Sequence, residues 1–431
     1  MTSRQLVFSL LQKAEKNRQF SNIALDHALS DSDLSAPDRA LATGIFYGVI
    51  ERRLTLDYQL EHLSARPLSE LDPFVLTALR MGLYQLIYMD RIPPHAVLYE
   101  TVALCPKKSA GFVNAVLRAY TRKPELCLPD RKADPAHFLS VAYSVGLPLC
   151  EKLLSVYGEE QTEALLDSFC RPTPTTIRAN TLRIGRTKRQ ENIEEAEPTS
   201  FSTTGLRVRG SVRELYGFGE GLFFVQDEAS QLCVEALDAQ EGEHIADICA
   251  CPGSKSFGIA IQMKNKGRID AFDLHAKKLP LIESGASRLG IDIITASVRD
   301  GRDFIPELEQ ACDRVLCDVP CSGFGVLAKK PELRYKDPAE SAALPDIQLA
   351  ILENACRYVK LGGVLVYSTC TVLPEENEDN VRRFLSRHPE FSLTPFRVGS
   401  MEVPEGMKTL LPCREGTDGF FIAKLTRNES K

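Results

Sequence analysis

The sequence lacks the segments that direct a chain into or across a membrane. Its opening residues, MTSRQLVFSLLQKAEKNRQF, turn polar after a few positions, and no apolar run approaches the ~20 residues of a membrane span. We therefore expect a cytoplasmic protein without membrane attachment. The chain also lacks any C-x-x-C pair, and its seven histidines are not spaced with its cysteines. These absences argue against a zinc site and a thioredoxin-like redox site, so we expect no metal.

Two nucleotide-binding patterns are missing as well. The chain contains neither G-x-G-x-x-G nor G-x-x-x-x-G-K-[ST], so NAD and nucleoside triphosphates are not indicated. It contains 13 cysteines, an odd number that argues for reduced thiols in a chain without a secretion signal. We expect most of them to be small, buried apolar side chains.

The domain organisation follows from length and periodicity. At 431 residues the chain is too long for one hydrophobic core and should form several domains. Residues 1–125 repeat apolar residues at a three-and-four spacing, which predicts an all-helical bundle. The groups SAPD at 35–38 and LDPF at 71–74 indicate helix starts. Three prolines and mixed charge at 124–135 indicate an interdomain linker.

The remaining residues predict two further parts. Residues 136–228 are typical of a small α/β connecting module, with helices followed by a strand in TTIRANTLRI. From 229 to 431, strand-length apolar runs alternate with helical stretches, which predicts a Rossmann-like, doubly wound α/β domain. In such sheets ligands bind beyond the carboxyl ends of the strands. The expected strands cover 244–249, 268–273, 292–298, 314–319 and 362–369.

Polar loops follow the first three of these strands. The first strand ends in DICACPGSKS, where Gly253 opens a helix and lets the backbone approach an adenosine-type ligand. Asp273 closes the second strand nineteen residues after Ser254, near the ~20-residue offset of an acid that meets ribose hydroxyls. Asp300 follows the third strand. A single acid at a strand end is as often a helix N-cap, but three successive loops favour a ligand site.

Two cysteines end the fourth and fifth strands. Cys321 stands in DVPCSGFG with Asp318, and Cys370 stands in YSTCTVLPEEN. Beside an adenosine cofactor, a thiolate that adds to carbon 6 of a pyrimidine turns carbon 5 into a nucleophile for a methyl group. A carboxyl group such as Asp318 would assist by protonating or hydrogen-bonding nitrogen 3 of an unstacked base. On the residues alone either cysteine could attack, and each could instead be buried packing.

Charge is unevenly distributed along the chain. The net charge is −6, yet residues 101–124 and 168–190 contain lysine and arginine and no acidic residue. Such segments suit either local contacts with phosphates or basic faces exposed to solvent. The acids of PEEN at 374–377 are explained by a helix start, where Glu375 and Glu376 complement the helix dipole. The basic residues are Lys107, Lys108, Arg118, Arg122, Lys123, Arg171, Arg178, Arg183, Arg186, Lys188 and Arg189.

Several motifs together carry a family resemblance. DICACPGSKS, DVPCSGFGVLAKKPELRYK, YSTCTVLPEENEDNV and DGFFIAKL resemble the RNA cytosine-5 methyltransferases of the Sun family, also called Fmu or NOL/NSUN-like. RANTLRI and FFVQDEASQL resemble the module that precedes the catalytic domain in this family, and GFVNAVLRAYTRK at 111–123 resembles the RNA-binding factor NusB. The combination is similar to enzymes that methylate a cytosine of small-subunit ribosomal RNA. The resemblance covers nearly the whole chain.

The resemblance implies a cofactor and its binding residues. S-adenosylmethionine would be held by the first loop, with Asp273 on the ribose and Asp300 near the adenine. Asp318 would lie beside the methionine end and the target base. The residues of the first loop are Cys249, Ala250, Cys251, Pro252, Gly253, Ser254 and Lys255.

The same resemblance separates the two cysteines. It implies that Cys370 is the nucleophile and that Cys321 assists release of the product. The family usually has CAAPGGKT in the first loop, so Cys251, Ser254 and Ser256 replace alanine, glycine and threonine. If position 254 needs a positive φ, a serine there costs roughly 1 kcal/mol.

We therefore expect a monomeric, S-adenosylmethionine-dependent methyltransferase that acts on carbon 5 of a cytosine in small-subunit ribosomal RNA. Two alternatives remain open on the sequence. The substrate could be transfer RNA, or the chain could be a non-catalytic RNA-binding factor of the NusB type.

Overall fold

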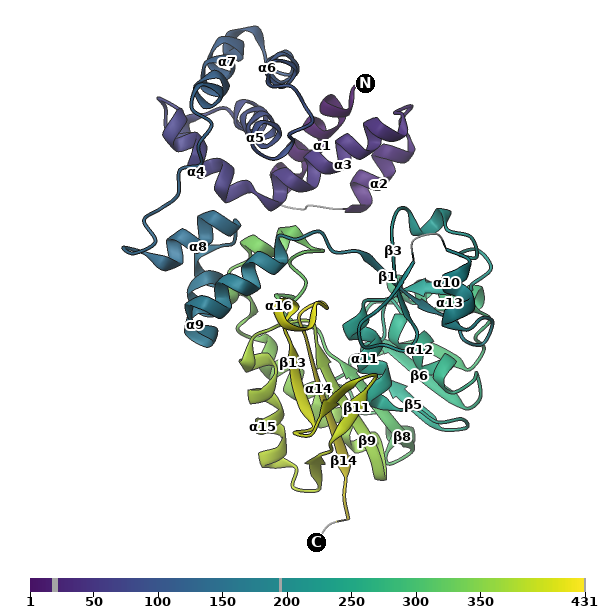
Figure 1. The fold of residues 1–431 in the computed structure, drawn as a ribbon. Coiled ribbons are helices and arrows are strands. Elements are labelled where there is room, and N and C mark those ends of the chain that lie inside the picture. Colours follow the sequence, from purple (N-terminus) through teal and green to yellow (C-terminus); the bar gives the residue numbers. More distant parts are fainter. Residues whose placement is uncertain (18–21, 194–195, 430–431) are drawn as a thin grey trace. The chain divides into compact units, whose positions relative to one another are not determined.

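The computed structural model describes residues 1–17, 22–193 and 196–429, which form two compact units (Figure 1). The helical unit contains Met1–Cys170 and Lys330–Asp337, and the sheet unit contains Arg171–Lys329 and Pro338–Lys431. This division differs from the boundaries expected at residues 125 and 228. The helices that follow the linker join the N-terminal helices, and a short segment from the second half of the chain joins them too.

The helical unit has the helix starts that the sequence predicts. Ser35 Oγ accepts a hydrogen bond from Asp38 N at 3.3 Å, and the Asp72 carboxylate accepts one from Phe74 N at 2.9 Å. Among the described residues no single helix has the length and apolar character of a membrane span; α8 and α9 meet that test only as a pair bent by 118°. The helices are α1 (Ser3–Asn17), α2 (Asn22–Ser30), α3 (Ala36–Glu51), α4 (Arg53–Leu63), α5 (Pro73–Tyr88), α6 (Pro94–Ala103), α7 (Lys107–Arg122), α8 (Pro135–Tyr143) and α9 (Leu147–Phe169).

Buried polar contacts explain why the linker and α8 pack with the N-terminal helices. Thr55 Oγ1 of α4 donates to the Val141 carbonyl of α8 at 2.6 Å. Gln59 of α4 holds the linker, because its Oε1 accepts from Cys127 N at 2.9 Å. The two residues of each pair are 86 and 68 positions apart in sequence, so local sequence periodicity cannot predict these contacts.

A buried ion pair joins three helices of the bundle. The Arg80 guanidinium of α5 is 2.6 and 2.8 Å from the two Asp57 carboxylate oxygens of α4, and it also contacts Glu15 of α1. The Arg80 side chain is only 11% exposed. Burial lowers its pKa, but the hydrogen bonds and charges of the two carboxylates outweigh burial and raise it.

Residues Lys330–Asp337, which we call the anchor segment, pack within the helical unit although they fall between two strands of the sheet unit in sequence. Pro331–Tyr335 form a 3₁₀ helix. Arg334 is 1% exposed and donates to the carbonyls of Phe169 at 2.5 Å and Tyr143 at 3.0 Å. These are the last residues of α9 and α8, whose carbonyls have no partner inside their own helices. The guanidinium therefore caps two helix ends at once.

Tyr335 holds the anchor segment by its hydroxyl and its ring. The hydroxyl donates to the Ile50 carbonyl, accepts from Arg53 N at 3.1 Å and lies 3.0 Å from Ser144 Oγ. The Arg53 guanidinium lies 3.9 Å from the ring centroid. Burial raises the pKa of Tyr335, so the hydroxyl keeps its proton and its donor role.

The sheet unit begins with a small antiparallel sheet. The strand predicted in TTIRANTLRI is β1, and it is flanked by β3 and β4 in the order β2-β3-β1-β4. The elements of this part are β1 (Thr175–Ala179), α10 (Arg186–Glu191), β2 (Glu197–Pro198), β3 (Gly205–Val208) and β4 (Phe223–Val225).

The main sheet has the order β10-β14-β9-β8-β5-β6-β7, with β13 paired to β14. Strands β5 to β9 are parallel, and β14 runs antiparallel beside β9 (Figure 1). The predicted doubly wound architecture is thus confirmed. The elements are α11 (Glu228–Leu237), β5 (His244–Asp247), α12 (Ser254–Gln262), β6 (Arg268–Asp273), α13 (Leu279–Leu289), β7 (Ile294–Val298), β8 (Cys312–Asp318), α14 (Leu344–Ala355), β9 (Val359–Thr369), α15 (Glu378–Arg387), β10 (Phe391–Leu393), β11 (Phe396–Val398), β12 (Met401–Val403), β13 (Met407–Leu410), α16 (Pro412–Glu415) and β14 (Phe420–Arg427).

Both faces of this sheet are buried. Ile245 of β5 packs in the core formed with α11, α12 and α13, and its neighbour Ala246 packs in the core formed with α14 and α15. Alternation of this kind places successive side chains on opposite faces. Because β5, β6, β7, β8 and β9 are parallel, their carboxyl ends meet along one edge.

Candidate active site

The loop after β5 makes a tight, glycine-dependent turn into α12. Gly253 has φ 106°, and a Cβ there would lie 2.6 Å from the Phe257 ring. Ser254 is the first residue of α12, so the positive φ falls on Gly253 and the serine carries no such cost. Ser256 Oγ donates to the buried Asp247 carboxylate at 2.6 Å. Burial raises the pKa of Asp247 to about 7, although the Ser256 hydrogen bond opposes the shift.

Four carboxylates affect the pKa of the Cys249 thiol in this loop. Burial raises the pKa of Cys249 first, and the charges of Asp247, Asp318, Asp273 and Asp300 raise it further. The edge of the sheet therefore gathers carboxylates, which favour a ligand with positive charge or hydroxyl donors, although Asp318 and Asp300 are already paired with Lys255 and Arg302. The sequence predicted Asp273, Asp300 and Asp318 as site residues. It did not single out Asp247, which is the last residue of β5.

The Asp273 and Asp300 side chains have different surroundings. The Asp273 carboxylate accepts from Cys251 N at 3.3 Å and His275 N at 2.9 Å, so it ties the first loop to the end of β6. Asp300 lies beyond β7 and pairs with Arg302 at 2.6 Å. The hydrogen bond from Arg302 lowers the pKa of Asp300 to about 2. Asp300 is thus ionised but already partnered.

Lys255 and Asp318 form an ion pair between the first and fourth loops. Lys255 Nζ is 2.7 Å from Asp318 Oδ2, and Ser368 Oγ donates to Asp318 Oδ1 at 2.8 Å. Burial lowers the pKa of Lys255, but the charge of Asp318 and the hydrogen bond outweigh burial and raise it. The charge of Cys370 contributes to this shift in the pKa of Lys255 as well.

The two cysteines of the fourth and fifth strands meet at this edge. Cys321 Sγ is 3.1 Å from Cys370 Sγ and 3.3 Å from Cys370 N. The hydrogen bond to Cys370 raises the pKa of Cys321 well above its usual value, and burial adds to the effect. Cys321 is therefore a neutral thiol that can donate a hydrogen bond to its neighbour.

Close backbone contacts hold the loops of the two cysteines against the start of β14. Gly325 N donates to the Cys370 carbonyl at 3.0 Å, and Gly419 N donates to the Gly325 carbonyl at 2.8 Å. A Cβ on Gly325 would lie 1.9 Å from the Gly419 carbonyl oxygen. The glycines of the DGFF and SGFG motifs are thus needed where two backbones touch.

Glu376 has a role that the sequence interpretation did not identify. The PEEN motif does not start α15: Pro374–Glu376 form a 3₁₀ helix, and Glu376 is 1% exposed. Its carboxylate accepts from Ser322 N at 2.9 Å and from Gln348 Nε2 at 2.8 Å. The carboxylate therefore fixes the residue after Cys321. No local signal distinguishes it from Glu375, because its partners lie 54 and 28 residues earlier in the chain.

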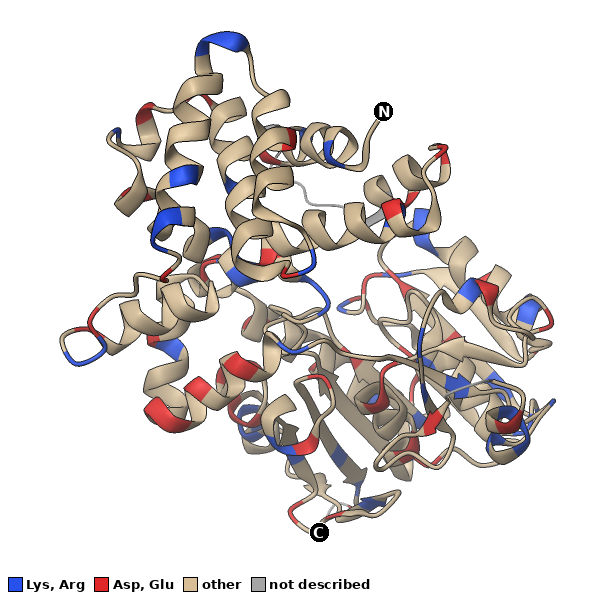
Figure 2. Cartoon of the chain, turned by 45° about the horizontal axis from the view of Figure 1, so that its top comes forward, with Lys and Arg blue, Asp and Glu red and all other residues tan. Residues whose placement is uncertain are grey.

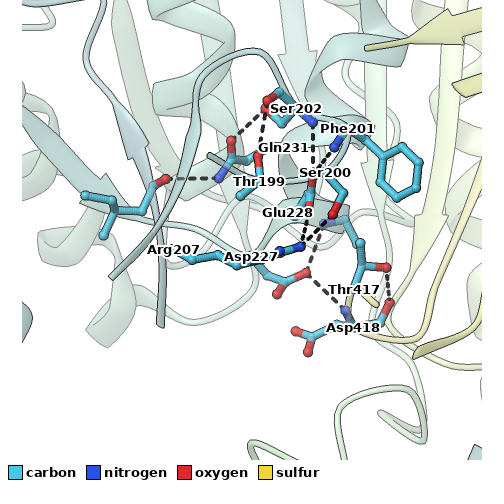
Figure 3. Close-up of polar contacts among 12 residues, drawn as sticks. Thr199, Ser200, Phe201, Ser202, Arg207, Asp227, Glu228, Gln231, Thr417 and Asp418 are labelled. Atoms are coloured by element: carbon cyan, nitrogen blue, oxygen red, sulfur yellow. Dashed lines mark hydrogen bonds and ion pairs between the residues drawn. The ribbon is translucent and has the colours of Figure 1, made fainter. Parts of the chain in front are cut away.

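The start of α11 links the small sheet to the main sheet (Figure 3). The Glu228 carboxylate accepts from Phe201 N at 2.5 Å and Ser202 N at 3.0 Å, and it lies 3.4 Å from Arg207. Asp227 accepts from Asp418 N at 3.4 Å, which connects α11 to the turn before β14.

The two basic stretches differ in how many of their charged side chains are exposed. The five basic residues of 107–123, in and just after α7, are exposed. In the second stretch Arg178 and Arg189 are buried, where Arg178 donates to Gln226 at 3.3 Å and the Arg189 guanidinium lies 4.5 Å from the Phe223 ring. Figure 2 shows lysine and arginine interspersed with acids over both units.

Comparisons with known proteins agree with this architecture. A family model described as "16S rRNA methyltransferase RsmB/F" matches residues 234–426, and the NusB family model matches residues 1–122. A Bacillus subtilis protein named "Probable ribosomal RNA small subunit methyltransferase B" is 35% identical over 442 residues, covering 98% of both chains. The chain belongs to the RsmB/F family. A protein of Escherichia fergusonii named "Ribosomal RNA small subunit methyltransferase B" is 33% identical over 432 residues, which cover 96% of both chains.

Solved structures similar to this RsmB/F member have the same fold. The crystal structure of PH0851 is 28% identical, with a TM-score of 0.80 over 99% of both chains. A "Methyltransferase Homolog Protein from Pyrococcus Horikoshii" is 26% identical, with a TM-score of 0.59 over 68% of this chain and 99% of that one. These comparisons confirm the prediction of an RNA methyltransferase with an N-terminal NusB-like part.

Proposed function

We propose that the chain methylates carbon 5 of a cytosine in small-subunit ribosomal RNA, with S-adenosylmethionine as the methyl donor. The observation that carries the proposal is the 3.1 Å approach of Cys321 and Cys370 beside the Lys255–Asp318 ion pair. A sulfur nucleophile, a neutral thiol next to it and an ion pair that holds a proton are the groups that addition to a pyrimidine requires.

The residues at this edge fit S-adenosylmethionine. The cofactor carries positive charge and ribose hydroxyls, which suit the carboxylates around Cys249. The turn at Gly253 has no room for a Cβ, because Phe257 and Ile282 fill that space, so the sharp entry into α12 at this loop depends on glycine. Residues 249–255 would hold the cofactor, Asp273 its ribose, and Asp318 its methionine end. When bound, it supplies an electrophilic methyl group.

The reaction begins when the flipped cytosine meets Cys370. The Cys370 thiolate, stabilised by the hydrogen bond from the Cys321 thiol, forms a bond to carbon 6. The Lys255–Asp318 pair hydrogen-bonds or protonates nitrogen 3, which accommodates the electrons displaced from the ring. Carbon 5 is then nucleophilic and would form a bond to the methyl group of the bound cofactor, as the bond between that methyl group and sulfur breaks and leaves its electron pair on the sulfur.

Release reverses the addition. The proton on carbon 5 leaves to solvent, and the electrons of that bond restore the double bond between carbons 5 and 6. The bond between carbon 6 and sulfur breaks, and its electron pair returns to Cys370. The Cys321 thiol donates a hydrogen bond to the departing sulfur, and nitrogen 3 returns its proton to the Lys255–Asp318 pair.

The helical unit supplies an RNA-binding surface in this proposal. The exposed basic residues of 107–123 form an acid-free segment that suits phosphate contacts. Such contacts position the substrate without reading its sequence.

Substitution of Cys370 tests the nucleophile. Cys370→Ser, incubated with unmodified small-subunit ribosomal RNA and labelled cofactor, should lose carbon 5 methylation. Cys413→Ala is the matched control, because this half-buried cysteine lies in α16 rather than in one of the five loops that follow β5 to β9, and it should retain activity. Transfer RNA serves as the second substrate. Methylation by Cys370→Ser at the wild-type rate would refute the assignment.

Substitution of Cys321 tests the release step. Without the neighbouring thiol the sulfur of Cys370 leaves poorly, so Cys321→Ala should accumulate a protein–RNA adduct that survives denaturation. Gel electrophoresis with labelled RNA measures the adduct. Normal turnover with no adduct would contradict the role given to Cys321.

A further inference from the structure

We propose that residues 329–335 form a two-ended anchor through which the helical unit positions the loop that carries Cys321. One end is held in the sheet unit and the other in the helical unit, with a few residues between them. Arg334 and Tyr335 are then positioning residues, which act on the reaction through the Cys321 loop. The part of the inference that concerns RNA rests on the proposed function.

Lys329 is the end held in the sheet unit. Its ammonium is 2.5 Å from Asp227 and 2.8 Å from Asp418, and Figure 3 shows these two acids side by side. Burial raises the pKa of Asp418 to about 7, and the charge of Asp227 adds to the shift. Lys329 supplies the positive charge that this acidic pair needs, so the end of the loop is held where α11 and the DGFF turn meet.

Arg334 and Tyr335 are the end held in the helical unit. Arg334 caps α8 and α9 through their last carbonyls. The backbone of the segment takes part as well, because Gly146 N donates to the Arg334 carbonyl at 2.7 Å. With the three hydrogen bonds of the Tyr335 hydroxyl, these contacts bury polar groups that would be costly to leave unpaired.

The chain between the two ends is short. Four residues, 330–333, lie between Lys329 and Arg334, and even a fully extended chain from one to the other spans at most roughly 18 Å. On the other side of Lys329, the loop is held to the catalytic strands through Gly325 N, which donates to the Cys370 carbonyl, and Ser322 N, which donates to Glu376. We therefore expect a displacement of the anchor segment to shift the residues around Cys321 as well.

Amide hydrogen exchange tests the anchor without any substrate. Tyr335→Phe keeps the ring and removes the hydroxyl, and Ser144→Ala removes one of its partners without altering the segment. In both full-length variants the amides of Gly325 and Lys329 should exchange faster, by about fivefold for the loss of the hydroxyl.

The matched control is Tyr358→Phe, which removes another buried hydroxyl with three hydrogen bonds, to Ile305 N, Asn354 Nδ2 and the Asp303 carbonyl. This variant should leave exchange at Gly325 and Lys329 unchanged. Equal exchange at these amides in Tyr335→Phe and Tyr358→Phe would overturn the anchor.

A substrate comparison tests the consequence for catalysis. We expect wild type to methylate a long ribosomal RNA fragment with a higher kcat/KM than a short stem-loop around the target, because the long fragment offers additional phosphates to the exposed basic residues of 107–123. Tyr335→Phe should reduce the ratio of the two kcat/KM values by about fivefold, whereas Tyr358→Phe should not change it. A general loss of folding would lower both values together. An unchanged ratio in Tyr335→Phe, or no preference for the long fragment in wild type, would count against the anchor. If wild type methylates neither RNA, the proposed function fails and hydrogen exchange alone decides the anchor.

Discussion

Gly253→Ala should damage the sheet unit and the proposed cofactor loop, residues 249–255, more than a comparable glycine substitution elsewhere. Two costs combine at this position. An L-residue at φ 106° costs about 1–2 kcal/mol. The new Cβ would also lie 2.6 Å from the Phe257 ring and 3.3 Å from Ile282 Cα. Phe257 is 6% exposed and packs edge-on against Phe224, so it cannot move aside freely. Overpacking of this kind adds about 1–3 kcal/mol.

Gly242→Ala isolates the steric part of this cost. Gly242 also has a positive φ, 84°, but a Cβ there has nothing within 4 Å. The two variants share the backbone cost, so Gly253→Ala should lose about 1–3 kcal/mol more than Gly242→Ala. The total loss is the sum of two decreases relative to wild type. One is the decrease in the free energy of unfolding, measured in urea, and the other is the decrease in the free energy of S-adenosylmethionine binding, measured by calorimetric titration.

The distribution of the loss identifies what the loop does. If the protein keeps its fold by distorting the loop, the whole loss falls on binding and Kd rises about 5- to 150-fold. If the loop keeps its shape, the loss falls on stability and Kd changes little. Equal losses for Gly253→Ala and Gly242→Ala in both measurements would refute the reasoning, because the contact with Phe257 would then cost nothing.

Three further predictions concern buried charge. Because the pKa of Asp247 is about 7 when folded and near 3.8 when unfolded, its contribution to stability falls as pH rises from about 4 to 7. In urea unfolding, the free energy of unfolding of Asp247→Asn should therefore rise relative to that of wild type as pH rises from about 4 to 7, by at most ~1.4 kcal/mol per pH unit. A difference between the two proteins that does not change with pH would contradict this. Glu376→Ala leaves Ser322 N without its acceptor, so it should cost about 1–3 kcal/mol in urea unfolding and slow formation of the RNA adduct, while Glu376→Gln restores both. Arg80→Met leaves the half-buried carboxylates of Glu15 and Asp57 without their cation, so it should lower the free energy of unfolding of the helical unit by roughly 3 kcal/mol. Arg131→Met, whose ion pairs are exposed, should leave the unfolding temperature nearly unchanged.

The parallel strands were predictable because each is a short apolar run that local pattern reveals. Once the strands are placed, topology brings Asp273, Asp318 and Cys370 to one edge without further information. The same reasoning could place Cys321, but only the structure gives its 3.1 Å distance from Cys370.

Contacts between distant residues were not predictable from pattern. Glu376 follows a strand in a segment that has the composition of a helix start, and its burial depends on Ser322. Arg334 stands in a polar, lysine-rich stretch that would ordinarily be solvated, and its burial depends on the ends of α8 and α9. The boundary expected at residue 125 differed for the same reason, since Thr55 and Val141 meet only after folding.

The anchor segment also affects the order in which the chain can fold during its synthesis. Residues 1–170 are made first, but the helical unit needs Arg334 and Tyr335 to complete it. At ~5–20 residues per second, the ribosome takes roughly 10–30 s to extend the chain from residue 170 to residue 337. Throughout that delay the last carbonyls of α8 and α9 lack the hydrogen bonds from Arg334. The helical unit therefore has a last piece that is translated after most of the sheet unit, and a pause of the ribosome before residue 334 would prolong its incomplete state.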